Sequence, residues 1–242
     1  MGKIPMLFTA PMVRALLEVR KFETRRATIP QAGTRWHKRP MPNATFRGWF
    51  TNVPHRHGSE TVVVAPRVGD LIWVRESYQL PAILNTTPPR RVSSLSPVHY
   101  VADGRLDDMD GDGRQLKVRP GIHMPAWASR LTMPVSGFRI ERLHDIDEDG
   151  AIREGVVEYA DEIVDMVGTP SGHPQEVYGT RYRVPGVHDD YEGFETAVDA
   201  YADLWDRING PGAWDANPWV AVTSWSGVWT RNVLDVEKEQ AA

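Results

Sequence analysis

A lysine and a threonine stand three residues apart in the segment VRKFETRR, residues 19–26, which also carries three arginines and one glutamate. A lysine whose pKa is lowered can act as a base near neutral pH, and a threonine hydroxyl assisted by a base is a nucleophile. On a regular strand, residues three apart point to opposite faces, so Lys21 and Thr24 converge only if the backbone bends between them. The pair alone is a weak signal, because about one such spacing is expected by chance in a chain of this length at average composition.

A second group of candidates lies in a basic stretch. Residues 25–59 contain seven arginines and lysines and no acidic residue. The cations Arg35, Lys38, Arg39 and Arg47 can neutralise phosphates. Neighbouring aromatic rings can stack on bases, and these rings belong to Trp36, Phe46, Trp49 and Phe50. The stretch therefore predicts either an RNA-binding surface or a solvated loop whose rings pack onto the core.

Two segments have residue types found in metal sites. DMDGDG, residues 108–113, matches the start of a calcium-binding EF-hand loop, but Arg119 stands where that loop needs a bidentate acid. His55 and His57 have no cysteine or carboxylate close by in the sequence. We predict no metal site and no cofactor.

The elements that must position the Lys-Thr pair are short. Residues 4–8 predict a strand, and Pro11 predicts the first turn of a helix that Thr9 or Ala10 caps. Cations at the end of this helix suit its negative pole. A second strand is predicted to begin at Thr24, so the pair lies at a helix-to-strand connection, where the backbone bends.

Later elements follow from similar signals. The apolar alternation over residues 131–140 changes parity at Ser136-Gly137, which predicts a β-bulge in a curved sheet. Asp147 is a predicted cap for a short acidic helix that runs to about Glu154 and ends at Gly155. The other predicted elements are strands over residues 71–78, 98–102 and 218–225, and an amphipathic helix with Phe194, Val198, Tyr201, Trp205 and Ile208 on one face, closed by Gly210.

Short, non-repeating strands with few helices and no βαβ alternation predict an α+β fold with a small barrel-like core. We predict a single domain over residues 1–230, with long irregular insertions at about 28–68 and 157–190. Residues 231–242 are polar and predict a flexible C-terminal tail.

The composition of the chain bears on the cellular compartment in which the protein is expected. The chain has no cysteine, which excludes disulfides and thiolate chemistry and agrees with a reducing cytoplasm. The first apolar run is broken by Pro5 and Pro11, so no export signal is expected. No apolar window approaches the roughly 18 to 20 residues that a membrane span needs. We therefore predict a soluble protein with no membrane partner.

Four segments together resemble the ASCH family, and most closely its long members from bacteriophages and prophages. These segments are RKFETRR after the first helix, VGDLIWVRES, LHDIDEDGAIREGV and WDRINGPGAWDANPWVAVTSW, and GIHMPAWASR resembles the long members as well. The resemblance implies a PUA-like β-barrel with flanking helices and long loop insertions. It also implies a nucleoside or RNA as partner, and a bacterial or phage-infected bacterial cell as location.

The resemblance also implies roles for particular residues. Small members of the family include amidohydrolases that remove the acyl group of N4-acetylcytidine with a Lys-x-x-Thr pair and a distant glutamate. By this resemblance Lys21, Thr24 and Glu154 are the catalytic residues. Burial of Lys21 beside Arg20, Arg25 or Arg26 would lower its pKa, as a base requires. Relatives often have glycine two positions before the lysine, where this chain has Val19.

Four further residues are predicted to bind substrate. Arg26 follows the Lys-Thr pair, Arg75 and Glu76 belong to the WVRES segment, and the ring of Trp127 can stack on a base. On a strand, Arg75 and Glu76 point to opposite faces, so at most one of them faces a pocket.

Two other functions stay open beside the hydrolase. The protein is either an enzyme of this type, or a non-catalytic RNA-binding module, or a phage accessory protein whose insertions dock another protein. The sequence makes no prediction of oligomeric state.

Overall fold

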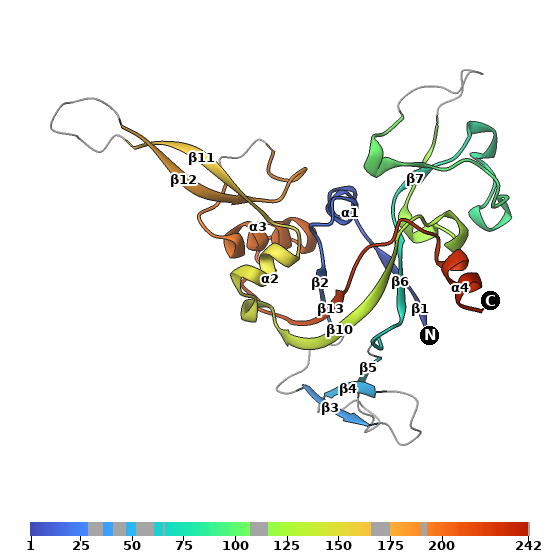
Figure 1. The fold of residues 1–242 in the computed structure, drawn as a ribbon, viewed down its shortest axis with the longest axis horizontal. Helices are drawn as coiled ribbons and strands as arrows, with labels where there is room; N and C mark the ends of the chain where they lie inside the picture. The colour runs from blue at the N-terminus through green and yellow to red at the C-terminus, as the bar shows by residue number, and fades with distance from the viewer. Residues whose placement is uncertain are drawn as a thin grey trace.

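The computed structural model describes residues 1–28, 36–40, 47–51, 61–64, 66–106, 116–165, 175–189 and 193–241. For residues 36–64, 161–165 and 175–178 the description covers the backbone only. The chain forms a mixed α+β fold with several sheets, which confirms the predicted fold class at this level (Figure 1).

The centre of the molecule is a five-stranded sheet of order β1-β6-β10-β13-β2. Strand β1 runs parallel to β6, and the other neighbours are antiparallel. The strands are β1 (Lys3–Leu7), β2 (Glu23–Ala27), β6 (Leu71–Arg75), β10 (Thr132–Arg142) and β13 (Trp219–Trp225).

Strand β10 is the long, curved member of this sheet (Figure 1). It pairs with β6 at its start and with β13 along the rest of its length, and the register with β13 shifts between Val135 and Gly137. This irregularity lies at the predicted Ser136-Gly137 bulge, which is confirmed. The bulge lets one strand serve two differently oriented neighbours.

No ladder joins β1 to β2 among the described strands, so these two strands are the edges of the sheet and no closed barrel is detected. A side chain spans part of the gap, because the Arg26 guanidinium on β2 donates to the carbonyl oxygen of Leu7 at the end of β1.

Helix α1 (Ala10–Leu17) connects β1 to β2 and has Pro11 in its first turn, as predicted. Its residues Val13 and Leu16 are fully buried. They pack with the buried side chains of β6 and β10 and with Trp225 of β13. This cluster fixes the helix against one face of the sheet.

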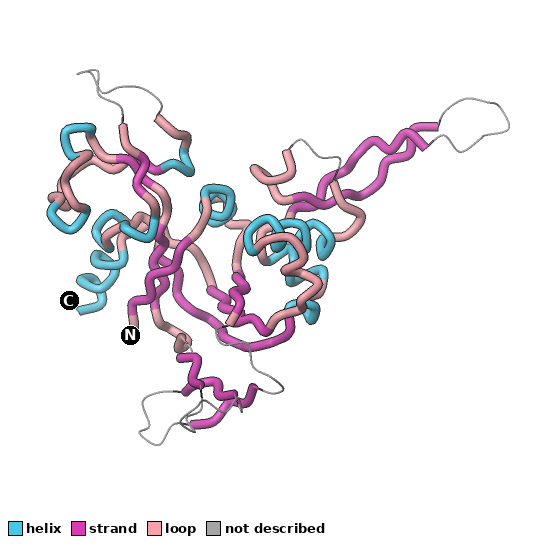
Figure 2. Tube along the Cα trace, turned by 180° about the vertical axis from the view of Figure 1, so that it is seen from behind, coloured by secondary structure: helices cyan, strands magenta, loops and turns pink. Residues whose placement is uncertain are grey.

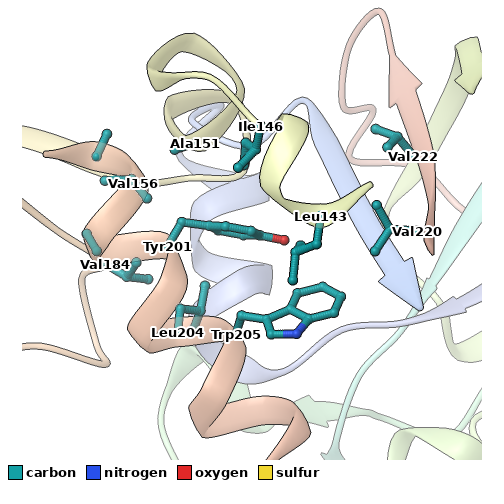
Figure 3. Close-up of a cluster of buried hydrophobic side chains, with 12 residues drawn as sticks. Leu143, Ile146, Ala151, Val156, Val184, Tyr201, Leu204, Trp205, Val220 and Val222 are labelled. Carbon is teal, nitrogen blue, oxygen red and sulfur yellow. The ribbon is translucent and has the colours of Figure 1, made fainter. Parts of the chain in front are cut away.

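Helices α2 (Glu148–Arg153) and α3 (Ala197–Asn209) lie together on the other side of β2 and β13 (Figures 1 and 2). The Asp147 carboxylate accepts from the Gly150 amide at 2.7 Å, so the predicted cap of α2 is confirmed. The predicted end of α3 at Gly210 is also confirmed. The core between them contains Leu143, Ile146, Ala151, Val156, Val184, Ala197, Ala200, Tyr201, Leu204, Trp205, Val220 and Val222 (Figure 3).

A separate lobe follows β6 and holds a small sheet of order β8-β7-β9. Its strands are β7 (Tyr78–Gln79), β8 (His99–Tyr100) and β9 (Val118–Arg119). Short 3-10 helices occur around it at Ala82–Leu84, Pro89–Arg91, Val101–Asp103, Gly121–His123 and Ala126–Ala128, and a further one follows β10 at Leu143–Asp145.

Both insertions differ from the irregular segments that the sequence predicts. The first contains an antiparallel sheet of β3 (Trp36–Pro40), β4 (Arg47–Thr51) and β5 (Thr61–Val64). The second is a hairpin of β11 (Val157–Asp165) and β12 (Gln175–Arg183) that extends away from the core as an arm (Figures 1 and 2). In such a ladder the backbone N–H and C=O groups of one strand hydrogen-bond to those of its neighbour. The strands can therefore form with a weaker apolar periodicity than a strand of the core has.

The C-terminal segment also differs from the predicted flexible tail. Residues Val233–Ala241 form helix α4, whose Val233 and Val236 are buried against Leu71 and Trp73 of β6. The Asn232 side chain anchors its start by donating to backbone carbonyl groups of residues 126, 127 and 129. Two valines three residues apart are a short signal, which the surrounding charged residues obscure in the sequence.

In the part of the chain that the structure describes, no helix is both long and apolar enough to cross a membrane.

Candidate active site

The turn after α1 places Lys21 and Thr24. Val19 has a φ of 54°, which is a left-handed conformation that a β-branched residue seldom adopts. The amides of Arg20 and Lys21 both donate to the carbonyl oxygen of Ala15, at 2.8 and 3.2 Å. The helix therefore ends in a tight reversal that sends Lys21 inward before β2 begins.

Lys21 meets Glu154 in the interior. The Lys21 ammonium forms an ion pair with Glu154 Oε2 and donates to the Glu154 carbonyl oxygen at 2.7 Å. The Lys21 side chain is fully buried, and that of Glu154 is 2% exposed. The two residues are 133 positions apart in the sequence. The fold thus brings together the lysine and the glutamate that the resemblance paired.

Glu154 lies at the C-terminal end of α2, followed by Gly155 with a φ of 107°. Its Oε1 accepts from the Arg25 amide at 2.6 Å, from Arg25 Nη1 at 3.4 Å and from the Tyr201 hydroxyl at 3.3 Å. Both carboxylate oxygens therefore have donors, and charge-assisted bonds of this kind fix the orientation of the group.

Arg25 belongs to a wider network of buried charges. Its Nη2 lies 3.0 Å from Glu23 Oε1 and 3.0 Å from Glu141 Oε1. Arg153 also pairs with Glu23, at 3.1 Å. Because Arg25 is shared among several carboxylates, it does not by itself neutralise Glu154, and Lys21 supplies the second positive charge.

Burial lowers the pKa of Lys21 below its ordinary value, and the positive charges of Arg26 and Arg25 act in the same direction. The ion pair and hydrogen bond with Glu154 oppose this shift without cancelling it. The predicted lowering is confirmed, with burial as its main cause. A lysine in this state loses its proton more readily than an exposed one.

Thr24 and Glu154 line a cavity of about 350 Å³ between β2, the start of α1 and helix α3. Thr24 is 3% exposed and pairs across the ladder with Thr223 of β13. The cavity walls consist of Leu7, Thr9, Met12, Thr24, Arg25, Arg26, Ala27, Glu154, Tyr201, Leu204, Trp205, Ile208 and Asn209. Lys21 lies behind Glu154, so it acts on the cavity through the carboxylate.

The chain matches no protein-family model, no curated protein and no solved structure. The function must therefore be argued from the cavity and its residues.

Arg26 lies at the exposed part of the cavity wall. Besides its bond to the Leu7 carbonyl oxygen, its guanidinium carbon lies 5.5 Å from the centre of the Phe8 ring. Of the four predicted substrate-binding residues, Arg26 alone lines this cavity.

The other three predicted substrate-binding residues lie elsewhere. Glu76 forms a two-pronged ion pair with Arg130, at 3.0 Å for each contact. The Arg75 guanidinium stacks over the Trp73 ring at 4.7 Å, and Trp127 packs against the core of the β7 lobe. None of these contacts brings Arg75, Glu76 or Trp127 to the cavity that Thr24 and Glu154 line.

The predicted RNA-binding residues are placed only in part. Arg35 lies outside the described residues, whereas Lys38 and Arg39 are on β3 and Arg47 is on β4, where only the backbone is described. The predictions for these four cations therefore stay predictions.

Metal binding has no described candidate. Residues 108–113, His55 and His57 lie outside the described residues. Among the residues that the structure describes, no group of three or more His, Asp or Glu side chains is arranged to hold a metal ion.

Sequence reasoning missed the contribution of α3. Tyr201 and Trp205 were predicted to lie on its apolar face, and both are buried there, yet both also line the cavity. Their spacing indicates only that they face inward. A polar atom on an inward-facing ring, such as the Tyr201 hydroxyl, is the one signal that points to a buried polar partner.

Proposed function

We propose that this protein is an ASCH-domain hydrolase of a cytidine-like nucleoside, which cleaves an N4-acyl amide with Lys21, Thr24 and Glu154. The observation that carries the proposal is the contact of buried Lys21 with Glu154 directly behind the cavity that Thr24 lines. The curved sheet, with α1 between its edge strands, is compatible with a PUA-like core, which belongs to the same proposal.

The turn before Lys21 supports the family assignment. Relatives often have glycine at the position of Val19, and Val19 adopts the left-handed conformation that glycine favours. The conformation of Val19 is therefore compatible with the family pattern, although the residue type departs from it.

The cost of the ion pair supports a functional role. Burying two charges costs several kcal/mol per ion in hydration, and replacing such a pair by apolar residues is often neutral or stabilising. A gain in stability alone therefore does not explain why Lys21 and Glu154 are buried as an ion pair. Its position against a cavity agrees with a role in proton transfer.

In the proposed reaction Thr24 Oγ1 attacks the acyl carbonyl carbon, and its proton passes to the Glu154–Lys21 pair. The C–N bond then breaks, and the pair returns the proton to the N4 amine as it leaves. The acyl group remains as an ester on Thr24, and water hydrolyses this ester to the carboxylic acid and the free hydroxyl. The leaving amine is delocalised into the pyrimidine ring, which makes it easier to expel than an alkyl amine.

Two cations serve this reaction in different ways. Arg26 donates to a backbone carbonyl oxygen rather than to a carboxylate, so its charge is available to a substrate and to the developing oxyanion. Arg25 instead holds Glu154 and two further carboxylates. Arg26 therefore faces the ligand, and Arg25 maintains the site.

The test is turnover of N4-acetylcytidine and a panel of other N4-acylcytidines, followed by chromatography of the released cytidine. We expect activity in the wild type and its loss in K21M, T24V and E154Q. The matched control is T223V, which makes the same change on the neighbouring strand at the residue paired with Thr24. No turnover of any panel member refutes the hydrolase, and unchanged activity in all three variants refutes the residue assignment.

A second proposed role, RNA binding, rests on the charge distribution of the first insertion. Within this insertion, the sequence from residue 28 to residue 59 contains five cations, Arg35, Lys38, Arg39, Arg47 and Arg56, and no acidic residue. We expect affinity for single-stranded RNA that falls with salt and is reduced when Arg35, Lys38, Arg39 and Arg47 are changed to Gln. Undetectable binding at low salt would remove this role and leave the hydrolase proposal untouched.

A further inference from the structure

Helix α3 supplies a group to Glu154 that the Lys-Thr-Glu pattern does not contain. The Tyr201 hydroxyl donates to Glu154 Oε1 at 3.3 Å, and the Tyr201 ring forms part of the cavity wall. Tyr201 lies 47 residues after Glu154, beyond the whole β11–β12 arm. The contact is therefore a product of tertiary structure rather than of a local motif.

The Tyr201 ring is buried and lies against two other aromatic rings. The residue is 3% exposed, and its ring lies 6.2 Å from that of Trp205 and 6.3 Å from that of Trp214, the latter in an edge-on arrangement. Figure 3 shows the ring projecting from α3 into the core, with its hydroxyl at the far end. A rigid ring delivers its hydroxyl to one place, which is the requirement for orienting a partner.

The hydroxyl of Tyr201 acts as a donor in this contact. Burial raises the pKa of Tyr201 well above its ordinary value, and the neighbouring Glu154 charge acts in the same direction. The phenol therefore keeps its proton, and the anionic form of the Glu154 carboxylate is the one that benefits from the bond.

The donors around Glu154 divide between its two oxygens. Lys21 binds Oε2, whereas Arg25 and Tyr201 bind Oε1. Arg25 approaches from β2, which also carries Thr24, and Tyr201 approaches from α3. Removing the Tyr201 hydroxyl leaves Oε1 held from the β2 side alone, so the carboxylate gains freedom to turn within the cavity.

We propose that Tyr201 is a positioning residue of this site, which holds Glu154 Oε1 so that the carboxylate keeps its orientation toward Thr24. The inference rests on the proposed hydrolase function. By this proposal α3 contributes a residue to the active site. The Tyr201 hydroxyl acts through Glu154 and not on the substrate.

The experiment compares the steady-state kinetics of Y201F and Y78F with those of the wild type. Both changes remove one buried hydroxyl and keep the ring, and the Tyr78 hydroxyl likewise donates over 3.3 Å, but to the His123 carbonyl oxygen outside the site. We expect Y201F to lower kcat about tenfold, the usual scale for one hydrogen bond to a charged group, with KM within about twofold of wild type. We expect Y78F to keep the wild-type kcat and KM.

The outcomes separate the two proposals. An active wild type with unchanged kcat in Y201F overturns the Tyr201 inference alone. A wild type without turnover of any N4-acylcytidine overturns the hydrolase proposal. In that case urea unfolding tests whether the Tyr201 hydroxyl and Glu154 interact. Y201F must destabilise the wild type more than it destabilises E154Q, and equal destabilisation in both backgrounds overturns the inference as well.

Discussion

Val19 has a backbone conformation that its residue type disfavours. Its left-handed φ of 54° is required for the reversal that sends Lys21 into the core, and its side chain is 54% exposed. A β-branched residue in this region carries a steric cost of about 1–2 kcal/mol. The side chain does not offset this cost by burial, so the site geometry is maintained by the surrounding structure.

We expect V19G to be more stable than the wild type by about 1 kcal/mol, because relief of the steric cost exceeds the extra chain entropy of glycine in the unfolded state. Urea unfolding measures the difference. The control is V68G, at another exposed valine in a turn, where φ is not positive and the same change should destabilise the protein. Equal effects at both positions would contradict the conformational explanation.

The Lys21–Glu154 pair makes a second prediction at the residue scale. K21M leaves the buried Glu154 carboxylate with Arg25 and the charge of Arg26 as its positive neighbours, which should cost about 3 kcal/mol in unfolding free energy. The double variant K21M/E154Q removes both charges, so we expect it to be more stable than K21M. Chemical denaturation of the two variants and of E154Q alone measures the coupling, and strictly additive losses would show that the two side chains do not interact.

Local signals in the sequence correctly predict part of the backbone that positions the candidate site. The cap at Asp147 and the end of α2 at Gly155 follow from side-chain chemistry within a few residues, so the position of Glu154 at a helix end could be predicted. The Tyr201 contact could not, because an aromatic residue on an inward helix face usually only fills the core. Its polar partner lies in another element, and the sequence has no signal for that pairing.

At the scale of elements, the turn between β12 and α3 depends on one histidine. His188 is 1% exposed, its Nδ1 accepts from the Val184 amide at 3.0 Å, and its Nε2 lies 2.9 Å from Asp203 Oδ2 on α3. The Val184 amide requires an unprotonated Nδ1, so the ring is neutral. Asp203 is also paired with Arg207, and the charge of Asp189 acts on the His188 ring as well.

This arrangement predicts a loss of stability on acidification. Burial lowers the pKa of His188 below its ordinary 6.5, so below about pH 6.5 the unfolded chain binds a proton that the folded chain excludes. Stability attributable to His188 is therefore complete above that pH and falls as the pH drops towards the lowered value, by up to about 1.4 kcal/mol per pH unit. Urea unfolding at pH 7.5 and 5.5 measures the loss.

The matched variant for this prediction is H188Q, which lacks the titrating ring, and the control is H144Q, at an exposed histidine. We expect the pH dependence of unfolding to decrease in H188Q and to stay as in the wild type in H144Q. The same pH dependence in H188Q as in the wild type would exclude His188 as its source.

The elements that the sequence failed to predict share one property. The β11–β12 arm and the β3-β4-β5 sheet are antiparallel ladders outside the central sheet, and α4 has a two-valine contact as its apolar face. Core strands such as β6 and β10 have long apolar patterns, which is why they could be predicted. Elements without a long apolar pattern escape prediction from periodicity even when the backbone is regular.

At the scale of the whole molecule, the arm stands apart from the cavity. Its ladder pairs Val157 with Arg183 at the root and Asp165 with Gln175 at the outer end, and among the described residues none of either strand lines the cavity. At the root, Tyr182 packs against the core cluster that includes α3. We therefore expect the outer part of the arm to be dispensable for the proposed hydrolysis.

We expect replacement of residues 161–179 by Asn-Gly to preserve turnover of N4-acetylcytidine within about threefold, because this turn keeps the root pairs from Val157 to Ala160. Steady-state kinetics of the shortened and wild-type proteins measures this, with urea unfolding to confirm that the shortened chain is folded. A folded but inactive shortened protein would show that the arm takes part in the reaction.

The pairing of β2 has a consequence for the order in which the protein is made. Strand β2, which carries Thr24, forms its ladder with β13, and β13 ends at Trp225 of a 242-residue chain. During synthesis at about 5–20 residues per second, β2 cannot form this ladder until the chain has been made through β13. A nascent or truncated chain that ends before β13 therefore lacks the strand that pairs with Thr24, and the proposed site cannot assemble in it.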